Sequence, residues 1–100
     1  MSEKPPRAYE EFVTTFPQLG EAWDAARRQE ESGPLDEKTR RLVKLGIAVG
    51  AMRQGAVSSA ARKARGAGAT EAEIEQIVAL AASTLGFPAA VAVFTWVRGA

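Results

Sequence analysis

The segment from Leu45 to Met52 constrains the fold of this chain most strongly, because it carries no charged residue and lies inside a longer helical pattern. A helix that is apolar on every side is normally buried by its neighbours. Gly46 and Gly50 lie one turn apart on the same face, where another backbone could approach closely. The sequence therefore predicts a buried central helix with a packing seam.

The residues around this segment predict where helices begin and end. Asp36 can cap the central helix, which is expected to end around Gln54-Gly55. Thr70-Glu71-Ala72-Glu73 is a capping box, and it follows a helix closed by Gly66 or Gly68. The other predicted helices are Ala8–Thr15, Pro17 to about Glu31, Ala56–Gly66, Thr70–Gly86, and Pro88 to near the end of the chain.

No segment shows the apolar and polar alternation of a half-exposed strand. The expected fold is therefore all-α, a compact domain of about six helices at residues 8–100. Residues 1–7 are expected to form a flexible lead, because Pro5-Pro6 opposes regular structure.

The first two predicted helices each place apolar residues on one side. We expect these residues to face inward: Tyr9, Phe12 and Val13 on the first helix, and Leu19, Ala22, Trp23 and Ala26 on the second. Trp23 and Trp96 are interpreted as core or interface anchors rather than ligand platforms.

The chain is short for the amount of apolar surface that it carries. It has 100 residues, 46% of them hydrophobic, and 20 are alanine, which buries little area per side chain. The helices after Thr70 are apolar on both sides, and exposed apolar faces of that extent usually mark an interface. We therefore predict an obligate homo-oligomer.

Cysteine and histidine are both absent, which excludes several kinds of chemistry. Disulfides, thiol redox reactions, zinc held by cysteine or histidine, and histidine general base catalysis all need one of these residues. Acidic residues do not cluster at the spacing of a magnesium or calcium loop, so we expect no metal and no cofactor. The net charge of +1 argues against a nucleic-acid partner.

The opening residues are polar, without the apolar core of a signal peptide, so a cytoplasmic protein is expected. Gln76 to Val97 carries no charge over a length that could span a bilayer. Gly86-Phe87-Pro88 interrupts that stretch, which predicts two short buried helices and no membrane span.

The order of these signals resembles the carboxymuconolactone decarboxylase family, which includes the AhpD-like alkylhydroperoxidases. The matching pieces are Phe16-Pro17, Leu35-Asp36-Glu37-Lys38-Thr39, Ala67-Gly68-Ala69-Thr70 with Glu73-Ile74, and Gly86-Phe87-Pro88-Ala89. The resemblance implies an all-helical fold that assembles as trimers or hexamers, with active sites near subunit interfaces.

The resemblance also implies where the family's reactive residues would fall. The paired cysteines of redox members correspond to Arg53 and Ala56, the histidine to Ala60, and the glutamate to Arg41. Peroxide reduction by a dithiol is excluded, because no side chain here can form a sulfenic acid or a disulfide. Decarboxylation of a small lactone or carboxylic acid needs stabilisation of an enolate and a proton for carbon.

Arginines at two of these positions suggest a pocket for a small anionic metabolite, because a planar guanidinium pairs well with carboxylate or phosphate. The candidate substrate-binding residues are Arg41, Arg53, Ser58, Ser59 and Arg62. Two alternatives stay open. The first is that these residues form only a solvated helix face and no pocket. The second is that the chain is a non-catalytic oligomeric binding or scaffold protein of the same fold.

Overall fold

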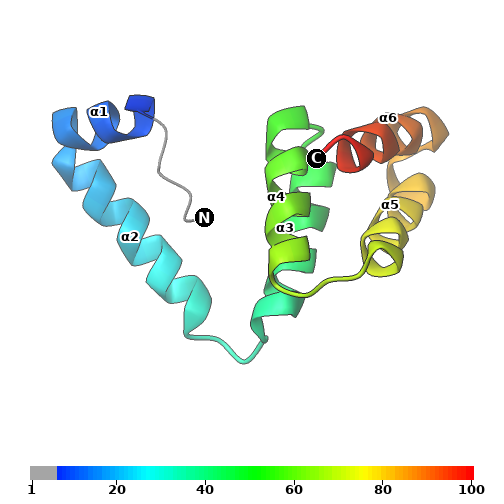
Figure 1. Ribbon diagram of the computed structural model, residues 1–100, viewed down its shortest axis with the longest axis horizontal. Coiled ribbons are helices and arrows are strands. Elements are labelled where there is room, and N and C mark those ends of the chain that lie inside the picture. Colours follow the sequence, from blue (N-terminus) through cyan, green and yellow to red (C-terminus); the bar gives the residue numbers. More distant parts are fainter. Residues whose placement is uncertain (1–6) are drawn as a thin grey trace. The chain divides into compact units, whose positions relative to one another are not determined.

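The computed structural model describes residues 7–100, which form six helices and no strand (Figure 1). The helices are α1 (Arg7–Thr15), α2 (Pro17–Glu31), α3 (Glu37–Gly50), α4 (Gln54–Gly66), α5 (Glu71–Leu85) and α6 (Phe87–Arg98). The predicted all-α fold is confirmed over these residues. Residues 1–6 of the predicted flexible lead lie outside the described part of the chain, and α1 starts at Arg7.

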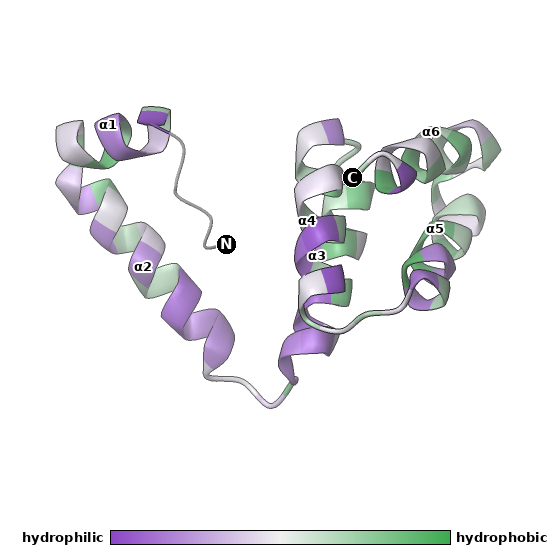
Figure 2. Ribbon diagram, viewed as in Figure 1, coloured by the Kyte–Doolittle hydropathy of each residue, from purple (hydrophilic) through white to green (hydrophobic). Residues whose placement is uncertain are grey.

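The chain divides into two compact units, Met1–Pro34 and Leu35–Ala100. The second unit holds α3 to α6, in which α3 packs against both α4 and α5, and α6 packs against both α5 and α4. Its largest fully buried side chains come from all four helices: Leu45, Val57, Ile74, Val93 and Val97. Figure 2 shows α5 and α6 as mostly hydrophobic ribbons, in agreement with this core. The single domain expected for residues 8–100 stays a prediction.

The central helix is only partly buried, so the prediction of burial on every side was wrong. Leu45 and Val49 are buried, but Ile47 on another face is 67% exposed. A methyl group added at Gly46 or Gly50 would meet no atom within 4 Å, so the expected close approach does not occur within the chain. The reason is that α4 and α5 supply neighbours for only part of the circumference of α3.

The helix boundaries after α3 follow local rules. The Gly68 backbone has φ +97°, and the amides of Gly68 and Ala69 donate to the carbonyls of Arg65 and Ala64 at 3.0 and 2.9 Å. This is the Schellman end of α4, which favours glycine because a side chain is strained at such a φ. Thr70 and Glu73 then form both bonds of the predicted capping box, so this boundary is confirmed.

The first unit contains α1 and α2, which pack where Gly20 faces Val13. A Cβ on Gly20 would lie 3.2 Å from the Val13 Cβ, so glycine allows the two helices to meet closely. Within this unit the inward-facing role predicted for Leu19 and Trp23 is wrong, because each is 53% exposed. No described residue of α1 or α2 is buried, since a pair of helices has no third layer to cover its apolar side.

Candidate functional site

A groove of about 350 Å³ lies between α3 and α4. Its walls come from α3, from the turn that joins the two helices, and from α4. The lining residues are Arg41, Lys44, Ile47, Ala48, Ala51, Arg53, Ala56, Ser59, Ala60 and Lys63. Helical periodicity explains the set, because residues three or four positions apart share a face of each helix.

Four of the lining residues are cationic, namely Arg41, Lys44, Arg53 and Lys63, and no described lining residue is acidic. Several charges of the same sign in one hollow raise the local electrostatic potential, because the low-dielectric walls focus the field. Ser59 adds a hydroxyl that can donate or accept a hydrogen bond. The groove is therefore suited to an anion.

The remaining residues of the groove lining are apolar. Ile47 and the small side chains of Ala48, Ala51, Ala56 and Ala60 complete the lining between the charged residues. Alanines leave space that larger side chains would fill. The groove can thus accommodate a ligand with an apolar body and an anionic group, which is the common composition of small-molecule sites.

The turn between α3 and α4 places Arg53 in the groove lining. Met52 has φ +53°, in the left-handed region that residues other than glycine rarely adopt. Arg53 follows in an extended conformation as the N-cap of α4, where its backbone carbonyl accepts from the Val57 amide at 2.9 Å. This tight reversal brings the Arg53 side chain into the same lining as Arg41.

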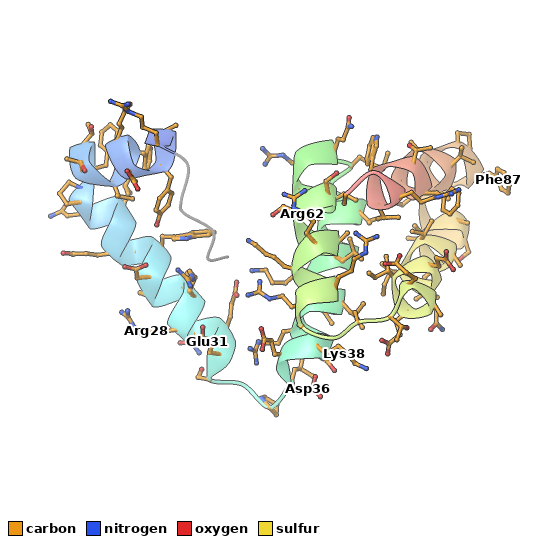
Figure 3. All side chains as sticks on the ribbon, viewed as in Figure 1. Arg28, Glu31, Asp36, Lys38, Arg62 and Phe87 are labelled. Carbon is orange, nitrogen blue, oxygen red and sulfur yellow. The ribbon has the colours of Figure 1, made fainter. Side chains whose placement is uncertain are left out.

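Two predicted site residues lie outside the groove. Ser58 donates from its hydroxyl to the Trp96 carbonyl on α6 at 3.3 Å, and Arg62 is exposed on α4 (Figure 3). Positions 58 and 62 share one face of α4, whereas 59 and 63 share the face that lines the groove. Sequence reasoning missed Lys44 and Lys63, although their helical spacing from Arg41 and Ser59 could have identified them.

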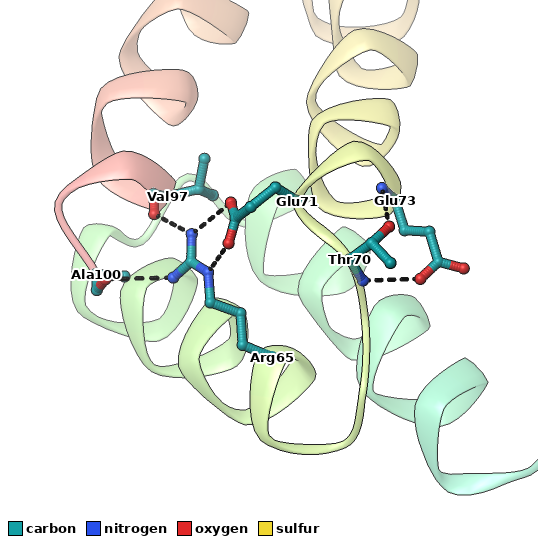
Figure 4. A network of polar contacts seen from close by, with 6 residues as sticks. All are labelled: Arg65, Thr70, Glu71, Glu73, Val97 and Ala100. Carbon is teal, nitrogen blue, oxygen red and sulfur yellow. Dashed lines mark hydrogen bonds and ion pairs between the residues drawn. The ribbon is translucent and has the colours of Figure 1, made fainter.

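A separate polar cluster joins the ends of three helices (Figure 4). The Arg65 guanidinium on α4 donates to the Glu71 carboxylate, to the Val97 carbonyl at 2.8 Å and to the Ala100 carbonyl at 3.2 Å. The hydrogen bond from Arg65 lowers the pKa of the Glu71 carboxyl and raises that of Arg65. These bonds satisfy carbonyls at the end of α6, which indicates a structural role.

Two other carboxylates have structural partners. Glu73 accepts from the Thr70 amide and from the Lys38 ammonium, and these bonds lower the pKa of its carboxyl. Asp36 caps α3 by accepting from the Thr39 amide at 2.8 Å, which lowers the pKa of that carboxyl. Within residues 7–100, no three acidic side chains gather in a way that could hold a metal ion.

A second hollow of about 180 Å³ lies between α3 and α5. Its lining residues are Gly46, Val49, Gly50, Ile77, Leu80, Ala81, Thr84 and Leu85. Thr84 supplies the hydroxyl of this lining, and that hydroxyl donates to the Leu80 carbonyl of its own helix at 3.3 Å. This hollow offers no charge to a ligand, so the α3–α4 groove is the better candidate site.

None of the described helices combines the length and the apolar character that a bilayer crossing needs.

The model of the carboxymuconolactone decarboxylase family matches residues 17–99, which run from the start of α2 to the end of α6. No match was found among curated proteins or among solved structures. The positions that the resemblance assigns to the family's reactive residues, Arg41, Arg53, Ala56 and Ala60, all line the α3–α4 groove. Over most of its length, this chain belongs to the carboxymuconolactone decarboxylase family.

Proposed function

We propose that the α3–α4 groove binds a small organic anion and that the chain decarboxylates a lactone acid there, without a metal or an organic cofactor. One observation carries the proposal. The lining combines four cations and one hydroxyl with apolar residues, and it includes Arg41, Arg53, Ala56 and Ala60, the positions where the family resemblance places the reactive residues. Arg41 and Arg53 can each form two parallel hydrogen bonds with a carboxylate, and their N–H groups can also donate to a carbonyl oxygen.

The reaction sets a condition on where the cations act. The bond between the ring carbon and the carboxylate carbon breaks, carbon dioxide leaves, and the electron pair is delocalised onto the lactone carbonyl as an enolate. Catalysis requires stronger interactions in the transition state than in the ground state. At least one arginine must therefore contact the carbonyl oxygen, where charge develops, rather than the carboxylate that loses it.

The enolate must then receive a proton at carbon. The lining contains neither a carboxylic acid nor an imidazole among the described residues, but the ammonium groups of Lys44 and Lys63 and the Ser59 hydroxyl carry protons. We assign the proton transfer to an ammonium group or to water held by Ser59. General acids of this kind contribute about 10²–10⁴-fold to a rate.

A binding role without catalysis is the second candidate. It is favoured by the absence of a carboxylic acid from the described lining and by the replacement of the family's cysteines, histidine and glutamate. Both candidates need the cationic groove, so ligand binding tests their common basis, and turnover separates them.

The test is the thermal unfolding midpoint of the purified protein with lactone acids, dicarboxylates and inorganic phosphate. A ligand at one hundred times its dissociation constant adds about 2.7 kcal/mol to the free energy of unfolding. We expect a saturable shift with the organic anions, which Arg41→Ala and Arg53→Ala reduce. No shift with any anion would overturn the proposal.

A matched pair of variants on α4 sharpens this test. Lys63 lines the groove and its neighbour Arg62 does not, although both carry a positive charge and are exposed. We expect Lys63→Ala to weaken anion binding and Arg62→Ala to leave it unchanged. Equal effects would mean that the overall charge attracts the anion and that the groove has no specific role. Carbon dioxide release by the unmodified protein then distinguishes the enzyme from the binding protein.

A further inference from the structure

The cationic residues of the α3–α4 groove are placed toward two opposite ends of the helix pair. The short turn at 51–53 joins α3 to α4, and the two helices pack side by side, so they run in opposite directions (Figure 1). Arg41 and Lys63 are each eleven positions from Met52 in that turn, so they lie at the same level of the helix pair. Arg53 belongs to the turn and therefore lies at the other end.

Helix geometry gives the separation of these two ends. Lys63 follows Arg53 by ten residues, and an α-helix rises about 1.5 Å per residue, so about 15 Å of helix separates their backbones. Within residues 7–100, the side chains of Arg41, Arg53 and Lys63 have no hydrogen-bond or ion-pair partner. Both ends of the groove therefore keep N–H donors for a ligand.

The lining between the two ends is mostly small and apolar. It consists of Ile47, four alanines and Ser59, with Lys44 one turn after Arg41. Ile47 is 67% exposed, so an apolar chain that lies over it removes apolar surface from water, which is favourable. The groove thus offers a cationic group, an apolar middle and a second cationic group in sequence along the helix pair.

We propose that the groove selects extended dianions, with one anionic group held by Arg41 and Lys63 and the other held by Arg53. A guanidinium is present at each end, and its planar fork suits a carboxylate or a phosphate. A compact dianion, with its charges on neighbouring carbons, reaches only one end and binds like a monoanion. This selectivity deepens the proposed function and rests on it: Lys63 and nearby Ser59 carry the transferable protons at the reacting end, and Arg53 determines specificity.

A series of unbranched dicarboxylates tests this selectivity. Isothermal titration calorimetry at constant ionic strength gives the dissociation constants of the dicarboxylates from malonate to sebacate, and of the monocarboxylates of the same chain lengths. We expect the affinity of the dicarboxylates to rise with chain length. The long dicarboxylates should bind about tenfold more tightly than the matching monocarboxylates, because hydrogen bonds to charged groups are strong but solvent weakens them at the exposed Arg53.

Single substitutions assign the two ends. Arg53→Ala should bring the long dicarboxylates down to the affinity of the monocarboxylates, whereas Lys63→Ala should weaken both classes. The Arg53 side chain forms no capping hydrogen bond with α4, so its removal leaves the start of that helix intact. Arg62→Ala is the matched control, because Arg62 is exposed on the same helix but does not line the groove. It should change neither class.

Three results would overturn the selectivity for extended dianions. Tightest binding of malonate or succinate would mean that both charges share one end. Equal affinities of dicarboxylates and monocarboxylates at every length would mean that only one end binds. Equal losses of both classes in Arg53→Ala would mean that Arg53 holds no second charge. In each case the groove still binds anions and the proposed function stands, whereas no binding of any compound would overturn both proposals.

Discussion

Two helices of equal length, α2 and α5, differ in what surrounds them. Each has 15 residues, but α5 buries Ile74, Val78 and Ala81, whereas α2 buries none. Both have local signals for a helix, with proline at the start of α2 and the capping box at the start of α5. The difference shows that helix formation is decided locally, whereas burial depends on how many neighbours a helix has.

The family match adds to this comparison, because it begins at Pro17 and so includes α2. The unit formed by α3 to α6 contains the hydrophobic core, whereas the unit of α1 and α2 has no buried residue among those described. We infer that the stability of the folded chain is concentrated in α3 to α6. Substitutions in the two units test that division.

The largest expected effect comes from the core of the second unit. Leu45 is fully buried, so Leu45→Ala removes contacts and leaves a cavity, which costs about 2–5 kcal/mol of unfolding free energy. Trp23→Ala removes a larger side chain from α2 but should change the urea midpoint of the dilute protein little. If Trp23→Ala costs as much as Leu45→Ala at low protein concentration, α2 is part of the core of its own chain.

A smaller effect is expected at Arg65, which holds three helix ends together. Arg65→Ala leaves the carbonyls of Val97 and Ala100 without this donor, and an unsatisfied polar group costs about 1–3 kcal/mol. Partial exposure of Arg65 favours the lower end, because water can replace part of the loss. Arg65→Lys should recover only part of the stability, since an ammonium lacks the planar fork. Equal stability of all three proteins in chemical denaturation would contradict the structural role of the cluster.

Acid should destabilise the second unit through three carboxyls. The pKa values of Asp36, Glu71 and Glu73 are lowered in the folded chain by their hydrogen bonds. A lowered folded-state pKa means that the unfolded chain binds more protons in acid. The stabilisation is therefore complete above the ordinary glutamate pKa of 4.5 and is lost as the pH falls through the folded-state values.

Glu73→Gln provides the control for this pH dependence. Glutamine keeps an oxygen that can accept from the Thr70 amide, but it cannot ionise or form the ion pair with Lys38. Unfolding free energy plotted against pH should then fall less steeply between about pH 5 and pH 2 than for the unmodified protein. Identical curves would mean that Glu73 does not contribute to the acid sensitivity.

The sequence predicted most helix boundaries, because they depend on neighbouring residues. The predicted end of the central helix around Gln54-Gly55 was wrong: α3 ends at Gly50, and Gln54 begins α4 after the turn at Met52. Asp36 and Thr70 each act within a few positions, and both were identified with their correct roles, whereas Gly68 was one of two candidates for the end of α4. The faces of α1, α2 and α3 could not be predicted in the same way. Periodicity shows that Leu19 and Trp23 share a side, but it does not show whether another helix lies there.

Only part of the candidate site was predictable from the sequence. The family resemblance pointed to Arg41 and Arg53, which the structure brings into one groove from two different segments. Ser58 was selected together with Ser59 because both lie close in sequence to Arg53, but a step of one residue turns a side chain by about 100° around the helix. Its hydroxyl consequently contacts Trp96 instead.

The smallest expected effect is at Gly46, and it tests whether the exposed side of α3 has a partner. Glycine inside a helix is about 0.5–1 kcal/mol less stable than alanine, and a methyl group at Gly46 would meet no atom within 4 Å. Gly46→Ala should therefore raise the urea midpoint slightly in a dilute sample that lacks oligomers. In a concentrated sample the same gain is expected when no other copy contacts the Gly46 face of α3. A loss of stability confined to the oligomer would instead show that another copy approaches the Gly46 face, as the packing seam predicted from the sequence requires.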